Sequence, residues 1–205
     1  MAAVTPAQIK ELRDRTSAGM SDCKNALVEA SGDMEKAVEI ILKKGIVKAA
    51  ARAGKVASEG EVATWTSADG KRGVIVEVNS QTDFVSRGDD FKKFVQDVLQ
   101  TATKAKKGDD IAKQVEDQRA QLSGRIGENI VVRRWDAVES KGSVTAYVHM
   151  GGKLAVLVAA EGPSNPEVKT FVENVAMQIA AMNPMVVRKD ELRGRRSWPG
   201  LGLLW

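Results

Sequence analysis

The chain offers few residues that could carry out covalent or metal chemistry. It contains one cysteine, Cys23, and one histidine, His149, which lie far apart in the sequence. A nucleophilic cysteine needs a nearby base, and zinc sites draw on several histidine or cysteine ligands. We therefore interpret Cys23 as a small buried apolar residue on a helix. Phosphate-loop and dinucleotide-binding patterns are also absent from the sequence, so we predict no catalytic residues, no metal, no cofactor and no enzymatic activity.

A polar segment that contains one aromatic residue is the strongest candidate for a binding site. Phe84 is one of four phenylalanines and lies in Gln81-Thr82-Asp83-Phe84-Val85, between a predicted strand and a predicted helix. Such connections lie at the surface, where binding residues concentrate. In one interpretation Phe84 or Val85 packs onto the core, and Thr82 or Asp83 is a turn residue. In the other, Phe84 is offered to a partner, and the residues alone leave both open.

Apolar residues at helical spacing predict three short helices in the first 45 residues. Thr5, Pro6 and Gln8 form a capping box at the start of the first helix. We place the later helix boundaries at Gly19, Ser21 or Asp22, Gly32, Asp33 and Gly45. Each helix is too short to persist alone, so we predict a three-helix bundle of the ubiquitin-associated (UBA-like) type over residues 1–45. Residues 46–57 read as a basic helical linker.

The first loop of this bundle holds Met20, which has two interpretations. Methionine suits adaptable apolar contact surfaces, so Met20 is a candidate binding residue. Alternatively, Met20 fills the core of the small bundle, and composition alone slightly favours that second interpretation.

From Glu59 the apolar residues alternate with a period of two, which predicts a hairpin with its turn at residues 67–70. The elements expected after the hairpin are a helix from about 89, a polar helix over 110–123, strands at 130–134, 143–149 and 153–160, and a helix over 166–182. The apolar residues expected on the inner side of the first of these helices are Phe91, Phe94, Val95, Val98 and Leu99. Those expected to face inward on the last helix are Val168, Phe171, Val172, Val175, Ala176 and Ile179. The fold class is therefore α+β, with the helical bundle followed by a domain of antiparallel sheet and packed helices over 58–192.

The net charge of +4 does not by itself indicate a nucleic-acid-binding protein. Residues 193–205 hold three arginines and no acid, and without them the 31 basic residues fall to 28 against 27 acids. Binding to phosphates needs a concentrated basic face. The best candidates for such a face are Lys43, Lys44, Lys48, Arg52 and Lys55, which we interpret as a solvated helix face. We predict no direct nucleic-acid partner.

Three motifs resemble those of the elongation factor Ts family, in the family's order and at family-like spacing. They are residues 16–27 (TSAGMSDCKNAL), 81–85 (QTDFV) and 126–134 (IGENIVVRR). The resemblance covers residues 5 to about 192. It implies nucleotide exchange on elongation factor Tu, a GDP-bound GTPase, rather than catalysis of bond making.

The resemblance also implies roles for individual residues. The loop Thr82-Asp83-Phe84-Val85 would reach between two partner helices and displace the bound magnesium ion. Arg13, Met20 and Lys24 would contact the partner's nucleotide-binding domain. The residues expected to face another partner domain are Ile126, Gly127 and His149.

After Leu192 the sequence departs from the family, whose members continue with further helices. Residues 193–205 lack any helical or strand period, and we expect them to be an atypical, disordered tail that reflects truncation or a frameshift. An alternative function follows, namely a protein that binds elongation factor Tu but has lost exchange activity. Without a signal peptide or a membrane-spanning apolar run, we expect a cytoplasmic location and no membrane partner. Whether copies of the chain form a homo-oligomer is left open.

Overall fold

The structure is a computed structural model that describes residues 4–163 and 165–187. The segment 193–205, which the sequence sets apart as a tail, lies outside the described residues. The chain divides into two compact units, and we describe each by itself. The first unit comprises Met1–Glu59, Ser80–Phe94 and Lys113–Val131, and the second comprises Gly60–Asn79, Val95–Ala112 and Val132–Trp205.

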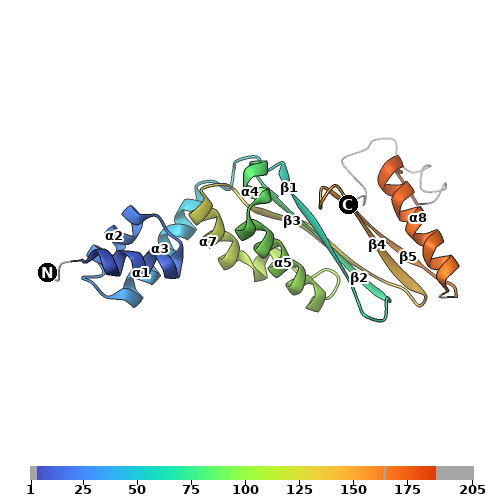
Figure 1. Cartoon of the computed structure of the whole chain (residues 1–205), viewed down its shortest axis with the longest axis horizontal. Helices are drawn as coiled ribbons and strands as arrows, with labels where there is room; N and C mark the ends of the chain where they lie inside the picture. The colour runs from blue at the N-terminus through green and yellow to red at the C-terminus, as the bar shows by residue number, and fades with distance from the viewer. Residues whose placement is uncertain (1–3, 164, 188–205) are drawn as a thin grey trace. The chain divides into compact units, whose positions relative to one another are not determined.

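Three helices form the bundle of the first unit, as predicted: α1 (Pro6–Thr16), α2 (Met20–Glu29) and α3 (Met34–Ala50) (Figure 1). The capping box is confirmed, because the Thr5 hydroxyl accepts from the Gln8 backbone N–H and the Gln8 side chain accepts from the Thr5 N–H at 2.9 Å. Asp33 caps α3 by accepting from the Lys36 N–H at 3.1 Å. The buried core of the bundle consists of Leu12, Cys23, Ala26, Leu27, Ala30 and Ala37.

The start of α2 differs from our prediction. Gly19, rather than Ser21 or Asp22, is the residue that precedes the helix. Its backbone is extended, and its carbonyl accepts from the Cys23 N–H at 2.9 Å, which begins the helical hydrogen-bond pattern. No side chain caps this end, because glycine has none to offer.

A glycine that we predicted to end the third helix lies inside it. Helix α3 continues through Gly45 to Ala50, so the predicted helix end at Gly45 is wrong, and residues 46–50 of the predicted helical linker belong to α3. The reason is tertiary, because Gly45 packs against Gly124 of α7 (Glu116–Ile126). A Cβ atom added to Gly124 would lie 2.6 Å from the Gly45 Cα atom, so the two helices make backbone contact there.

The strands form two small sheets. The first contains β1 (Glu59–Thr66), β2 (Arg72–Ser80) and β3 (Val131–Glu139) in that order. The second pairs β4 (Ser143–His149) antiparallel with β5 (Leu154–Ala160), with Ser143 opposite Ala160 and His149 opposite Leu154. Within the second unit, buried side chains of β1, β2 and β5 meet in a small apolar cluster of Val62, Ile75 and Ala155.

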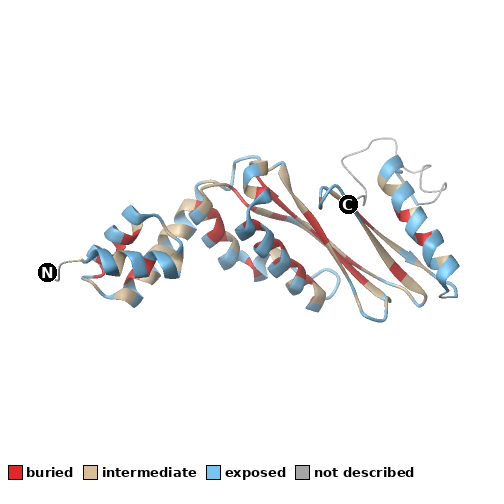
Figure 2. Cartoon of the chain, viewed as in Figure 1, coloured by how far each residue is buried: buried red, intermediate tan, exposed pale blue. Residues whose placement is uncertain are grey.

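The remaining helices are α4 (Asp83–Arg87), α5 (Asp89–Lys104), α6 (Ile111–Gln114), α7 and α8 (Pro166–Met182). The polar helix predicted over 110–123 is thus two helices, α6 and α7, interrupted at the buried Val115. Figure 2 shows buried residues along β2 and along α5. The α5 residues predicted to face inward are all buried, namely Phe91, Phe94, Val95, Val98 and Leu99.

The bounds of α8 match the prediction, but its buried face is narrower than expected. Val172 and Ala176 are buried, and α8 packs on the β4–β5 sheet. Phe171, which we predicted to point inward, is 66% exposed. Helix and sheet content together confirm the α+β class. Among the described residues, none of the helices combines the length and apolar character needed to cross a membrane.

Candidate functional site

The candidate segment, Thr82 to Val85, contains the start of the short helix α4, which begins directly after Thr82. The Thr82 backbone is extended, and its hydroxyl accepts from the Val85 N–H at 3.5 Å, which makes Thr82 the N-cap. The Thr82 carbonyl accepts from the Ser80 hydroxyl at 3.0 Å and from the Ser86 N–H at 3.3 Å. The segment that we predicted as a loop is therefore a short capped helix with several internal hydrogen bonds.

Phe84 is 86% exposed on this short helix, the largest exposed fraction of any described phenylalanine. In the same helix, Val85 is half-buried and Ser86 is buried. The two interpretations of the segment thus apply to different neighbours, because Val85 is half-buried while Phe84 is exposed to solvent. An exposed aromatic ring on a structured segment is the kind of side chain that binds a partner.

Asp83, at the first position of α4, forms an ion pair with Arg87 at 2.9 Å. The Arg87 side chain is mostly exposed, and such surface pairs contribute little free energy. The Asp83 carboxylate is therefore available to exchange Arg87 for a cation on a partner.

A carboxylate from a distant part of the sequence contacts this segment. Glu128 accepts hydrogen bonds from the backbone N–H groups of Gln81 and Thr82 at 3.1 and 3.0 Å, and from the Thr82 hydroxyl at 2.6 Å. Sequence reasoning missed Glu128 as a functional candidate. The available signal was its position, because an acid that directly follows Gly127 lies in the same motif as the predicted site residues.

The structure brings Ile126 and Gly127 into the same unit as the loop. Both are half-buried and lie at the end of α7, where Gly127 has a left-handed backbone with φ of 89°. His149 belongs to the second unit and ends β4. It is exposed, its ring stacks on Tyr147 at 5.8 Å between centroids, and its Nδ1 atom shares a hydrogen bond with the Tyr147 hydroxyl at 2.9 Å.

The N-terminal candidates lie on the surface of the bundle. Met20 is 58% exposed, which rules out its interpretation as a core residue. Arg13 and Lys24 are also exposed, and in residues 4–163 and 165–187 neither forms an ion pair with a carboxylate. These three side chains are therefore accessible to a partner.

Three of the four lysines of the predicted basic face have acidic partners. Lys44 pairs with Glu29 at 2.6 Å and Lys48 pairs with Asp22 at 2.8 Å. Lys43 lies 3.9 Å from the carboxylate of Glu39, its neighbour one turn away. These pairs offset the positive charge that a phosphate backbone would need.

Burial dominates the chemistry of Cys23, and it outweighs a hydrogen bond with Thr16 and the charge of Arg13, which favour the thiolate. The Cys23 side chain is fully buried in the bundle, and burial raises the pKa of the thiol. A protonated, inaccessible thiol is a poor nucleophile and a poor metal ligand. The part of the chain that the structure describes contains no group of three or more histidine, cysteine or acidic residues that could hold a metal ion.

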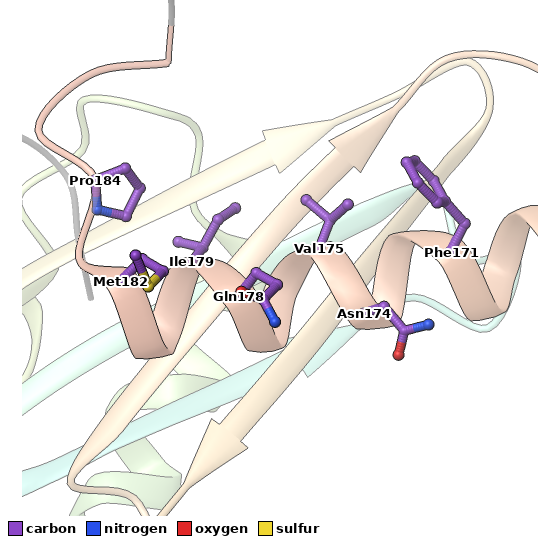
Figure 3. Close-up of a pocket in the computed structure, with 7 residues that line it drawn as sticks. All are labelled: Phe171, Asn174, Val175, Gln178, Ile179, Met182 and Pro184. Carbon is purple, nitrogen blue, oxygen red and sulfur yellow. The ribbon is translucent and has the colours of Figure 1, made fainter.

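An apolar groove on α8 is a second surface feature, in the second unit. Figure 3 shows Phe171, Val175 and Ile179 pointing to the same side of the helix, as expected for a spacing of four residues. Met182 and Pro184 close the groove at the end of the helix. None of the described residues that line it is titratable, so this lining offers apolar contact.

Comparison with known proteins covers both units. The family model described as elongation factor TS matches residues 81–195, which include α4, Glu128 and His149. Elongation factor Ts of Nitratiruptor sp. is 50% identical over 196 aligned residues, covering 89% of this chain and 64% of that protein. The Halothermothrix orenii protein of the same name is 43% identical, covering 90% of this chain and 65% of that protein.

A third relative matches over more of its own length. Elongation factor Ts of Arthrospira platensis is 46% identical, covering 94% of this chain and 79% of that protein. This chain thus spans a little under two thirds of the length of the first two relatives. The family-model match and the identities over about nine tenths of the chain agree, and the chain belongs to the elongation factor Ts family.

Proposed function

We propose that this chain binds elongation factor Tu and accelerates the release of its GDP by inserting Phe84 beside the partner's magnesium site. The single observation that supports this proposal best is the exposure of Phe84 on a helix whose backbone is fixed by hydrogen bonds. Family membership supports elongation factor Tu as the partner.

The physical basis of exchange is a difference in affinity between two states of the partner. GDP is held by contacts to its phosphates and by the magnesium ion, so displacement of the elements around that ion weakens GDP binding. Phe84 presents apolar area that is best buried in the displaced state. A ligand that prefers one state shifts the partner's equilibrium toward it, and that preference is what the exposed ring supplies.

The other candidate residues supply the rest of the interface in this proposal. Asp83 competes for cationic groups around the phosphate and metal site. Arg13, Met20 and Lys24, all exposed on the bundle, bind the partner's nucleotide-binding domain. The residues that would face another domain of the partner are Ile126, Gly127 and His149.

The test is to measure the release of a fluorescent GDP analogue from elongation factor Tu at increasing concentrations of this chain. Phe84→Ala is expected to lower the maximal release rate by roughly tenfold or more, since losing about 1.4 kcal/mol in the exchange step corresponds to a factor of ten. The matched control is Phe171→Ala, which truncates the other exposed phenylalanine and should leave release unchanged. Equal loss in both variants, or none in Phe84→Ala, contradicts the proposal.

A second candidate function is binding to elongation factor Tu without exchange. The observation that favours it is length, because the chain spans about 64% of the Nitratiruptor relative. A pull-down run beside the release assay separates the two functions. Retained binding with no acceleration of GDP release selects the second, and accelerated release selects the first.

A further inference from the structure

Glu128 uses both of its carboxylate oxygens on the segment that precedes Phe84. Its Oε2 atom accepts from the backbone N–H groups of Gln81 and Thr82 at 3.1 and 3.0 Å. Its Oε1 atom accepts from the Thr82 hydroxyl at 2.6 Å. Within the described part of the chain, no lysine or arginine forms an ion pair with Glu128. The groups that contact its charged carboxylate are the two backbone N–H groups and the Thr82 hydroxyl. Hydrogen bonds to an ionised acceptor are stronger than neutral ones.

The backbone around Glu128 is fixed on both sides. Before it, Gly127 ends α7 with a left-handed backbone, and the Ser123 hydroxyl donates to the Glu128 carbonyl at 2.6 Å. After it, the buried Asn129 side chain donates to the carbonyls of Ala53 and Lys55 at 3.3 and 2.7 Å. The carboxylate therefore projects from a rigid support and not from a mobile loop.

The contact with the Thr82 hydroxyl determines how α4 begins. A hydroxyl has one proton to donate, and here it goes to Glu128. The oxygen's lone pairs are then directed to the Val85 N–H, which is the capping bond of α4. A five-residue helix cannot persist without such tertiary support. The backbone that carries Phe84 thus depends on an acid 44 positions further along the chain.

We propose that Glu128 is a positioning residue for nucleotide exchange: it fixes Gln81 and Thr82 so that α4 presents Phe84 in its binding-competent orientation before the partner arrives. This inference rests on the proposed function for its consequence in exchange, but its structural half stands on the free chain alone. A preorganised segment loses less conformational freedom on binding. Glu128 would therefore lower the entropic cost of inserting Phe84 into the partner.

The first experiment examines the free chain by amide hydrogen exchange, resolved by NMR. In Glu128→Ala the amides of Gln81 and Thr82 lose their acceptor, and we expect their exchange to accelerate by roughly tenfold or more relative to wild type. The matched control is Glu139→Ala, since Glu139 is 76% exposed and its nearest cationic partner, Arg72, lies 3.7 Å away. Unchanged Gln81 and Thr82 amides in Glu128→Ala overturn the proposal.

Two subtler variants keep the test valid if Glu128→Ala fails to fold. In Glu128→Gln the amide oxygen still accepts from the two backbone N–H groups, but its NH₂ group cannot accept the Thr82 proton. Thr82→Val removes the same hydroxyl bond from the other side, together with the capping bond from the Val85 N–H. Because both variants break one shared contact, we expect their effects on GDP release to be clearly less than additive in the double variant. Full additivity contradicts the contact's role.

The second experiment measures GDP release from elongation factor Tu at saturating chain. We expect Glu128→Ala to lower the maximal release rate by about tenfold, Glu128→Gln to retain part of the wild-type rate, and Glu139→Ala to match wild type. If Glu128→Ala supports GDP release at the wild-type rate although its Gln81 and Thr82 amides exchange hydrogen faster, the positioning role is overturned. If even the wild-type chain leaves release unchanged, the proposed function fails, and the amide data alone decide whether Glu128 orders the segment.

Discussion

Most of the Phe84 side chain is exposed to water, so the free chain lacks the hydrophobic stabilisation that burial of the ring would give. Burial of a phenylalanine side chain contributes about 1.5–3 kcal/mol relative to exposure. The neighbouring Phe91 and Phe94 are buried, so the local sequence is capable of packing aromatic rings inward. The capped start of α4 places position 84 outward instead, which is consistent with a ring that is buried only in a complex.

Asp33 gives a residue-scale prediction about pH. The Lys36 backbone N–H that it caps lowers the pKa of the Asp33 carboxyl, so the ionised form is favoured in the folded chain. A carboxyl with a lowered folded pKa contributes stability above its unfolded pKa and loses it as the pH falls through the folded value. We expect Asp33→Ala to lower the melting temperature at neutral pH, with the difference from wild type shrinking as the pH falls below about 4.

Thermal unfolding of the two proteins by circular dichroism across this pH range checks the prediction. Asp33→Asn serves as the control, because asparagine is also a good N-cap but carries no charge to titrate. If the melting temperature of wild type exceeds that of Asp33→Ala by the same amount at every pH, the charge of the cap does not contribute to stability.

At the scale of elements, the crossing of α3 and α7 depends on two glycines with unequal roles. An added Cβ on Gly124 would lie 2.6 to 2.9 Å from backbone atoms of Gly45, too close for any side chain. An added Cβ on Gly45 would meet nothing nearer than the Gln121 Cα at 4.0 Å, an ordinary contact. The close approach therefore requires glycine at position 124 only.

This asymmetry predicts opposite effects of the same substitution. Gly124→Ala should force α3 and α7 apart and lower the free energy of unfolding by about 1–3 kcal/mol. Gly45→Ala should leave it unchanged or raise it by up to about 1 kcal/mol, since alanine is the better helix former. Urea unfolding of the two variants beside wild type measures both changes, and equal destabilisation would show that the crossing is not as close as described.

At the scale of the whole molecule, the bundle, α4 and Glu128 belong to one unit of the chain. If the chain exchanges nucleotide as we propose, binding and exchange can be separated by substitutions within that unit. Linkage would then require GDP to weaken the chain's affinity for elongation factor Tu by the same factor as the chain weakens the affinity for GDP. In our proposal Phe84 supplies the preference for the nucleotide-free state, and Met20 supplies affinity for both states.

The whole-molecule prediction concerns this coupling. Phe84→Ala should reduce the ratio of the chain's affinities for nucleotide-free and GDP-bound elongation factor Tu. Met20→Ala should weaken both affinities by similar factors and leave the ratio near its wild-type value. Val28→Ala is the matched control, because Val28 lies on the same helix with the same 58% exposure as Met20. Calorimetric titration against both forms provides the affinities, and an unchanged ratio in Phe84→Ala contradicts the assignment.

Features governed by neighbours in the sequence were predicted well. The capping box at Thr5, the cap at Asp33, and the bounds of α8 all follow from residues within one or two turns of each other. The buried face of α5 follows from apolar residues at helical spacing. Family motifs likewise depend on residue types and spacing, and they identified the family that the comparisons show.

Features governed by contacts between distant segments were decided by the tertiary structure alone. Local pattern predicts that Gly45 ends a helix, but α3 continues through it and packs against α7. Local pattern also predicts that Phe171 is a core residue, but α8 buries only a narrow face that does not include it. The sequence did not decide whether Met20 and Phe84 pack in the core or bind a partner, because the exposure of a side chain depends on which distant segments cover it. Glu128 and Thr82 are 46 positions apart, and local pattern carries no information about a hydrogen bond that forms only once the chain has folded.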